Sequence, residues 1–202
     1  MHPAAARLIQ PRFLLALGFL LFQLYLLIDP LQQEISLPVH IALSLIAVFI
    51  WMPADAGPRS RWIDALLILA SVAILAYYLI ELRRLSDRME NIDDVLNVDL
   101  LFGTLLILVL MEAVRRVVGW SLIIVIAVFV AYCFLGPWMP GWLAFQGFEY
   151  SLFIEIMTMA SHGLLGVTTQ TSVDFVWYFI LFGVVYSATG GGQLFIDSAL
   201  RL

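Results

Sequence analysis

Six apolar stretches, separated by short polar or charged segments, set the strongest limit on how this chain of 202 residues can fold. An α-helix of about 20 apolar residues crosses the hydrocarbon core of a bilayer, and each stretch approaches that length. Hydrophobic residues make up 63% of the chain and charged residues 12%, whereas a soluble domain has about half and a quarter. The sequence therefore predicts an all-α, polytopic integral membrane helical bundle with additional interfacial or amphipathic helices. The predicted spans are 13–28, 39–52, 62–82, 99–114, 118–135 and 174–188.

The composition argues against several other classes of protein. A net charge of −5 disfavours nucleic-acid binding, because a phosphate-binding face must be basic. Cys133 is the only cysteine, which excludes an intrachain disulfide and a thiolate metal cluster. The histidines stand far apart, and the chain has neither a nucleophile-elbow motif nor a phosphate-cradling glycine loop. We therefore expect no enzyme, no catalytic residue, no metal site and no cofactor. An intramembrane enzyme stays open only if Glu155 and His162 share a cavity.

The arginines at the ends of the stretches indicate an orientation. The positive-inside rule places the arginine-rich side in the cytoplasm, and with it the N-terminus. The linker 81–98 falls on the other side although it also carries arginines. It is net acidic and predicts a solvated amphipathic helix, with Arg83 and Arg84 as surface charges for a partner or for lipid. The arginines that alternation groups on the cytoplasmic side are Arg7, Arg12, Arg59, Arg61, Arg115 and Arg116.

Charges near the ends of the spans have simple helix-end explanations. Asp64 is predicted in the first turn of the third span, where a carboxylate suits the helix dipole, and Asp99 opens the fourth. Glu112 lies three and four residues before Arg115 and Arg116, so the three charges share one face of a helix. We expect the two arginines to anchor a tight turn at the headgroups.

The segment after the fifth span is irregular. Gly136–Trp142 combines turn formers with two indoles, which is typical of a chain at the headgroup layer. Residues 149–162 predict a short interfacial helix or re-entrant limb, on which Ser151, Glu155, Thr158 and His162 form one polar stripe.

A polar link, residues 167–172, then leads into the sixth span, which a Thr171–Asp174 capping box is predicted to open. Ionisable groups inside a membrane are expensive, and hydroxyl groups can coordinate a cation at a broken helix. Residues around the link are therefore candidates for facing a cavity, although helix-end chemistry or an interfacial loop is the alternative. The candidates are Glu155, His162, Thr169, Thr171, Ser172 and Asp174.

Several short motifs, taken in order, resemble the membrane subunits of tripartite ATP-independent periplasmic (TRAP) transporters, and in particular permeases whose small and large subunits are fused. Two departures stand out: His162 replaces an expected acidic residue, and Thr168–Gln170 replaces an apolar-Pro-apolar piece. The motifs are Asp99-Leu-Leu-Phe-Gly-Thr-Leu-Leu106, Leu110–Trp120, Tyr132–Pro137, His162–Gly166, Phe179–Gly183, Gly190–Gly192 and Phe195–Ala199.

The resemblance implies three parts. Residues 1–98 would be a small-subunit-like bundle with the acidic linker at its end, 99–148 a helical hairpin at the fused junction, and 149–202 the start of the transport domain. It also implies a bacterial inner-membrane location and sodium-coupled uptake of organic acids or similar small solutes.

The same resemblance implies three partners: the lipid bilayer, a large permease part and a periplasmic solute-binding protein. The family's sodium and substrate hairpins have no counterpart here, so we expect no family site in this chain and no transport by it alone. A membrane scaffold or assembly subunit without a part in transport is the alternative.

Overall fold

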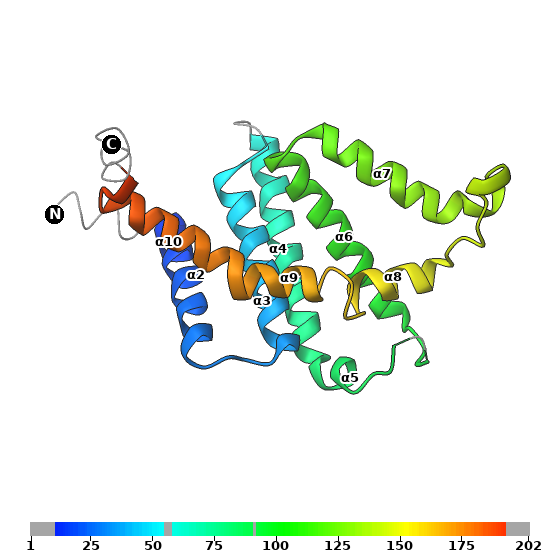
Figure 1. Cartoon of the computed structure of the whole chain (residues 1–202), viewed down its shortest axis with the longest axis horizontal. Helices are drawn as coiled ribbons and strands as arrows, with labels where there is room; N and C mark the ends of the chain where they lie inside the picture. The colour runs from blue at the N-terminus through cyan, green and yellow to red at the C-terminus, as the bar shows by residue number, and fades with distance from the viewer. Residues whose placement is uncertain (1–10, 55–57, 91, 193–202) are drawn as a thin grey trace, which may run out of the picture.

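The computed structural model describes residues 11–54, 58–90 and 92–192, and in this part of the chain all regular structure is helical (Figure 1). The predicted all-α class is confirmed. Five helical segments are long and apolar enough to cross a membrane, and a sixth apolar helix is shorter. The helices are α2 (Pro11–Ile28), α3 (Gln33–Trp51), α4 (Pro58–Ile80), α5 (Leu82–Ser86), α6 (Asn97–Val117), α7 (Trp120–Leu135), α8 (Tyr150–Thr158), α9 (Val167–Thr171) and α10 (Trp177–Ala188), with the short segments η1 (Gly136–Trp138), η2 (Gly141–Leu143) and η3 (Ser172–Val176).

Two helices, α3 and α4, begin four or more residues earlier than predicted. Helix α3 starts at Gln33 and contains Pro38, which was expected to lie outside the span. Pro38 is the sixth residue of the helix. Proline removes one backbone hydrogen bond, here the one that Glu34 O would accept, and the helix continues after this single loss. Helix α4 starts at Pro58, so Asp64 is not in its first turn. The helix-dipole explanation of Asp64 is therefore wrong.

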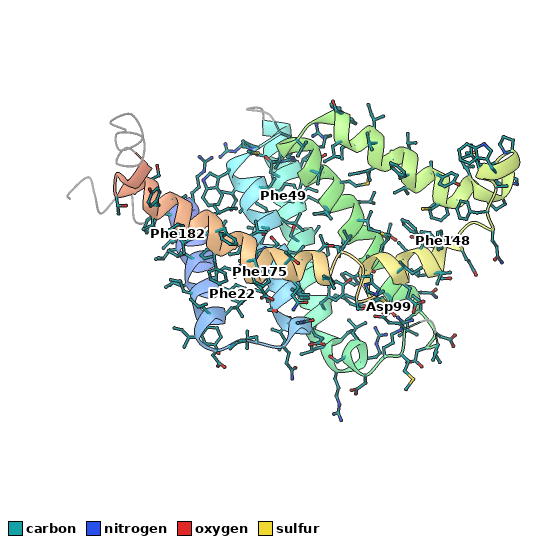
Figure 2. All side chains as sticks on the ribbon, viewed as in Figure 1. Phe22, Phe49, Asp99, Phe148, Phe175 and Phe182 are labelled. Carbon is teal, nitrogen blue, oxygen red and sulfur yellow. The ribbon has the colours of Figure 1, made fainter. Side chains whose placement is uncertain are left out.

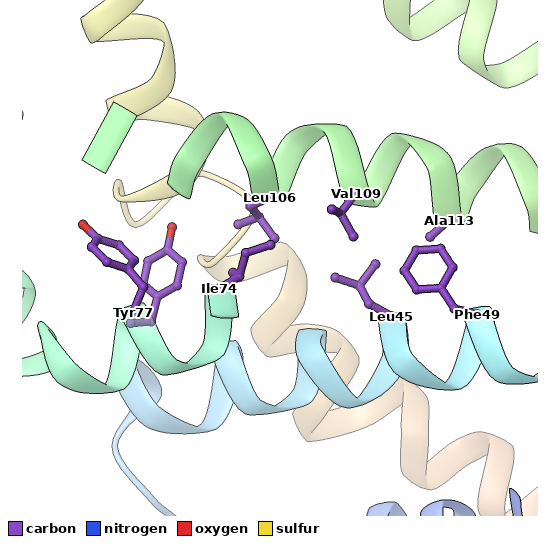
Figure 3. Packing of buried hydrophobic residues seen from close by; sticks show 8 residues of the cluster. Leu45, Phe49, Ile74, Tyr77, Leu106, Val109 and Ala113 are labelled. Carbon is purple, nitrogen blue, oxygen red and sulfur yellow. The ribbon is translucent and has the colours of Figure 1, made fainter. Parts of the chain in front are cut away.

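The core lies where α3, α4 and α6 pack against one another, with buried apolar side chains meeting between the helices (Figure 3). Phe49 and Leu106 are almost completely buried. Burying a side chain of this size contributes about 1.5–3 kcal/mol in a water-soluble protein, whereas between membrane helices close packing supplies most of the gain. Tyr77 lies at one end of this core (Figure 3), and Tyr78 is part of the same buried cluster.

Helix α8 is shorter than predicted, and it packs on α6 at a glycine. It ends at Thr158 rather than at residue 162, because the chain turns there through tight backbone hydrogen bonds, including Leu164 N–H to Met157 O. An added Cβ on Gly103 of α6 would lie 2.5 Å from Ile154 Cγ2 and 2.8 Å from Thr158 Oγ1. Only glycine permits this close approach.

The polar link 167–172 is helical, contrary to the prediction of an irregular link. α9, η3 and α10 form one run that crosses obliquely in front of α2 and α3 (Figure 1). Thr171 lies inside this run, and its hydroxyl donates to Val167 O at 2.9 Å. The predicted Thr171–Asp174 capping box is therefore wrong: the threonine bonds back to the preceding turn, as Thr often does inside a helix. The predicted motif Phe195–Ala199 lies outside the described residues.

The linker 81–96 is mostly not a helix. Helix α5 covers only Leu82–Ser86, and bends and turns follow before α6 starts at Asn97. Two of its charged residues, Arg84 and Arg88, are bonded to other parts of the chain, so the predicted solvated amphipathic helix is wrong.

Candidate functional site

Charged side chains form a cluster where α3, α4 and α6 meet at one end of the bundle. Arg116 Nη1 donates to Asp64 Oδ1 at 2.6 Å and to Met52 O at 3.1 Å. Arg115 and Arg116 both bond to Glu112, so the predicted shared face is confirmed. Only 3% of the Arg116 side chain is exposed, and its guanidinium lies over the Phe49 ring. Arg116 is therefore an internal tie to Asp64 and not a headgroup anchor.

A second cluster closes the opposite end of the α4–α6 pair. Asp99, which has no exposed surface, accepts from Tyr77 Oη, from both terminal nitrogens of Arg84, and from Leu96 N–H at 3.0 Å. The last bond caps the first turn of α6. The bond to Asp99 raises the pKa of the Arg84 guanidinium, and a further bond to Glu81 acts in the same direction. Arg84, predicted as a surface charge for a partner or lipid, is bonded within the fold. Figure 2 shows the position of Asp99 at this end of the bundle.

The linker and the chain after α8 are joined by a third set of contacts, which we call the linker clasp: Arg88, Glu90, Asp93, Glu155 and Ser161. Arg88 Nη2 lies 2.9 Å from Glu155 Oε1, and the two side chains are only 6% and 7% exposed. Arg88 also donates to Asp93 O at 2.6 Å. Glu90 Oε1 accepts from Ser161 N–H at 2.7 Å. The linker clasp thus holds two segments about 70 residues apart in sequence.

A cavity of about 270 Å³ lies beside the linker clasp. Its wall includes Arg88, Glu90 and Ser161, together with Glu34 from α3 and Gln170 from α9. The Nε–H of Arg88 is buried and has no partner among the described residues. The charged groups of the lining are one arginine, already paired with Glu155, and two carboxylates, so the cavity is net acidic although much of its wall is apolar.

A second cavity, of about 410 Å³, lies between α3, α6 and the 164–172 segment. Most of its lining is leucine, isoleucine, valine and alanine. His40, Ser44, Thr168, Thr169 and Ser172 supply its polar groups. Such a mixture of apolar walls and a few polar groups is common in ligand-binding cavities.

The predicted cavity candidates do not gather at one place. Thr169 and Ser172 line the larger cavity. Glu155 pairs with Arg88, whereas His162, Thr171 and Asp174 are exposed. Neither cavity described is lined by both Glu155 and His162. The part of the chain that the structure covers also has no group of three or more His, Cys, Asp or Glu side chains placed to hold a metal ion.

Sequence reasoning missed a polar pair inside the membrane-spanning part. Gln23 of α2 has no exposed surface, and its side chain bonds to Nδ1 of His40 at 2.5 Å. Tyr178 of α10 donates to the backbone oxygen of Gln23 at 2.8 Å, and Phe19 packs edge-on against the imidazole. The second span was predicted to begin at residue 39, which would place His40 at its end rather than inside the bundle. The one available signal was Gln23, the single polar interruption of an apolar stretch.

Comparison with known proteins gives one family. No curated protein and no solved structure matches the chain. Residues 105–202 match the family model described as the tripartite ATP-independent periplasmic transporter, DctM component. The match begins inside α6 and includes α7, α8, α9 and α10. It supports a transporter rather than an enzyme, and a multi-pass membrane protein. The match supports a membrane component of a TRAP transporter, with residues 105–202 of the chain similar to the DctM component.

Proposed function

We propose that this chain forms a bilayer-anchored part of a sodium-coupled permease that takes up organic acids or similar small solutes delivered by a periplasmic binding protein. The family match over residues 105–202 carries this proposal. The linker clasp supports the anchoring role, because buried ion pairs hold packed elements in one arrangement and breaking them is strongly unfavourable.

The family-matching half is tied to the first half at several places. Tyr178 bonds to Gln23, Tyr78 of α4 donates to Thr158 O at 3.2 Å, and Val173 is buried against Leu26 and Leu37. Sequence reasoning expected the last span to be the first helix of the moving transport domain. These contacts lead us to propose instead that α8–α10 stay fixed to the small-subunit-like bundle, while moving elements lie in another part of the permease.

We also propose that the N-terminus faces the cytoplasm of a bacterial inner membrane. Asp64, Met52 and Arg116 meet at one end of the bundle, which is the end predicted to be cytoplasmic. Arg84 and Arg88 at the other end are bonded to carboxylates, so Arg83 is the exposed arginine of the linker. Labelling of Cys133→Ser chains with a single new cysteine at position 83 or 61, using a membrane-impermeant thiol reagent on intact cells, tests this orientation. Labelling at 61 and not at 83 would refute it.

The proposed transport function is tested by solute uptake in proteoliposomes with an imposed sodium gradient. Vesicles receive the chain alone, a downstream large permease part alone, or both, each with and without the periplasmic binding protein. We expect uptake only when both membrane parts and the binding protein are present. Uptake by the chain alone would refute the expectation that it does not transport by itself. Equal uptake without the chain would favour the alternative of a scaffold with no part in transport.

A further inference from the structure

A compact cap at the far end of α7 stands away from the rest of the bundle (Figure 1). The cap is residues 136–148. Tyr132 Oη donates to Leu143 O at 2.8 Å, and Phe148 N–H donates to Cys133 O at 2.9 Å, so both ends of the cap are bonded back to α7. Phe145 packs against Tyr132 and over Gly136, where a side chain would collide with its ring. The cap is therefore a defined structure and not an open loop.

Two indoles are the most exposed large side chains of this cap. Trp138 is 82% exposed and Trp142 is 91% exposed. Hydrogen bonds that fold the cap leave these rings on its outside, where they contribute nothing to its packing. Exposed apolar side chains of this size mark a surface that meets lipid or another molecule.

The position of the indoles along the span matches the thickness of a bilayer. The continuous helical segment Trp120–Trp138 has 19 residues, which is about 28 Å at the rise of an α-helix and close to the hydrocarbon thickness of about 30 Å. Trp120, at the other end, is 63% exposed and lies beneath the Arg115 guanidinium. Indoles therefore stand at both ends of one span, which is the arrangement of the aromatic belts of membrane proteins.

The absence of charge around the cap favours lipid over a soluble protein as the neighbour of its two indoles. No residue from Val117 to Phe148 is charged, whereas a docking surface for a soluble protein surrounds its aromatic anchors with a polar rim. The helix that leads to the cap is also apolar and mostly exposed. We propose that the cap is a lipid-interface anchor: Trp138 and Trp142 insert among the headgroups and fix the depth of the far end of α7.

The test is tryptophan fluorescence of the full chain in phospholipid vesicles. The quenchers are phospholipids with bromine near the carbonyls, phospholipids with bromine near the chain ends, and aqueous iodide. We compare the wild type with a W138F/W142F chain, and with W177F as the matched control, because Trp177 packs against Phe19 and Tyr178. Trp51, Trp62 and Trp120 are also exposed and stay in both variants. We expect the double variant to lose a clear part of the emission that is quenched by shallow bromine, whereas W177F keeps it.

Two further results would overturn the proposal. Each is taken from the difference in emission between the wild type and a chain without the two indoles, for which W138Y/W142Y serves if W138F/W142F does not fold. If iodide quenched the emission of these two indoles more strongly than shallow bromine does, the cap would lie in water. It would then be available to a soluble protein. A cap whose emission is reached by no quencher would be covered by protein, such as a second copy of the chain. A W138Y/W142Y chain, which keeps interfacial side chains, should unfold at the same detergent concentration as the wild type.

Discussion

Removing one partner of the Arg88–Glu155 pair should destabilise the protein far more than removing both. The two side chains are 6% and 7% exposed, so Glu155→Met leaves a buried guanidinium without this carboxylate. Breaking such a pair costs about 3–5 kcal/mol, whereas replacing both charges by apolar side chains of similar size is often neutral. Arg88→Met should cost at least as much, because Arg88 also donates to Asp93 O.

The assay is unfolding of the detergent-solubilised chain by increasing sodium dodecyl sulfate, followed by far-ultraviolet circular dichroism. We expect each single variant to lose about 3–5 kcal/mol and the R88M/E155M double variant to lose less than either single variant, so that most of the summed loss is recovered. Arg83→Met in the same linker is the matched control, since this exposed side chain should change stability by less than about 0.5 kcal/mol.

Additive losses in the double variant would show that the pair is not coupled. A Glu155→Met chain within about 0.5 kcal/mol of the wild type would show that its charge is not buried in the membrane-embedded protein. Either result would refute the linker clasp as the tie between the two halves.

Three other changes test the packing and the end clusters. Gly103→Val should destabilise the chain by about 1–3 kcal/mol, because its Cβ would overlap Ile154. Gly18→Ala, with open space around the glycine, should be neutral or stabilising. Equal stability of the two variants in the same unfolding assay would contradict this prediction. Asp64→Asn should cost about 3 kcal/mol, the lower end for breaking a buried ion pair, because buried Arg116 loses Asp64 and keeps Glu112. A loss below about 1 kcal/mol would refute the tie. Asp99→Asn should cost about 2 kcal/mol, less than Asp64→Asn because its arginine partner is about a third exposed; a greater loss than in Asp64→Asn would contradict this ranking.

The spans were predictable because their signal is local. Apolar length alone located all six apolar helices, and the (i, i+3) and (i, i+4) spacing of Glu112 placed it on the face of the two arginines. Boundaries were less predictable. Pro38 is a helix breaker in most contexts, yet near the first turn of α3 it breaks little. Likewise, a threonine in a capping pattern can instead bond to the preceding turn, as Thr171 does.

The partners of buried charges were not predictable from one sequence. Arg88 and Glu155 are 67 positions apart in the numbering, and Asp64 and Arg116 are 52 apart. Sequence spacing carries no information about contacts over such distances, so each charge was assigned to the nearest simple explanation, a helix end or a solvated face. The cavities could not be predicted for the same reason. Thr169 and Ser172 line one cavity together with His40 only because α9 and η3 cross α3.

The tie between Asp64 and Arg116 has a consequence for the order in which contacts form during synthesis. Arg116 follows Asp64 by 52 residues, which a ribosome adds in about 3–10 s. During that interval Asp64 has no Arg116 with which to pair. The ion pair can form only after α6 has been made and has packed beside α4, so this end of α4 acquires its final contacts later than the helix itself forms.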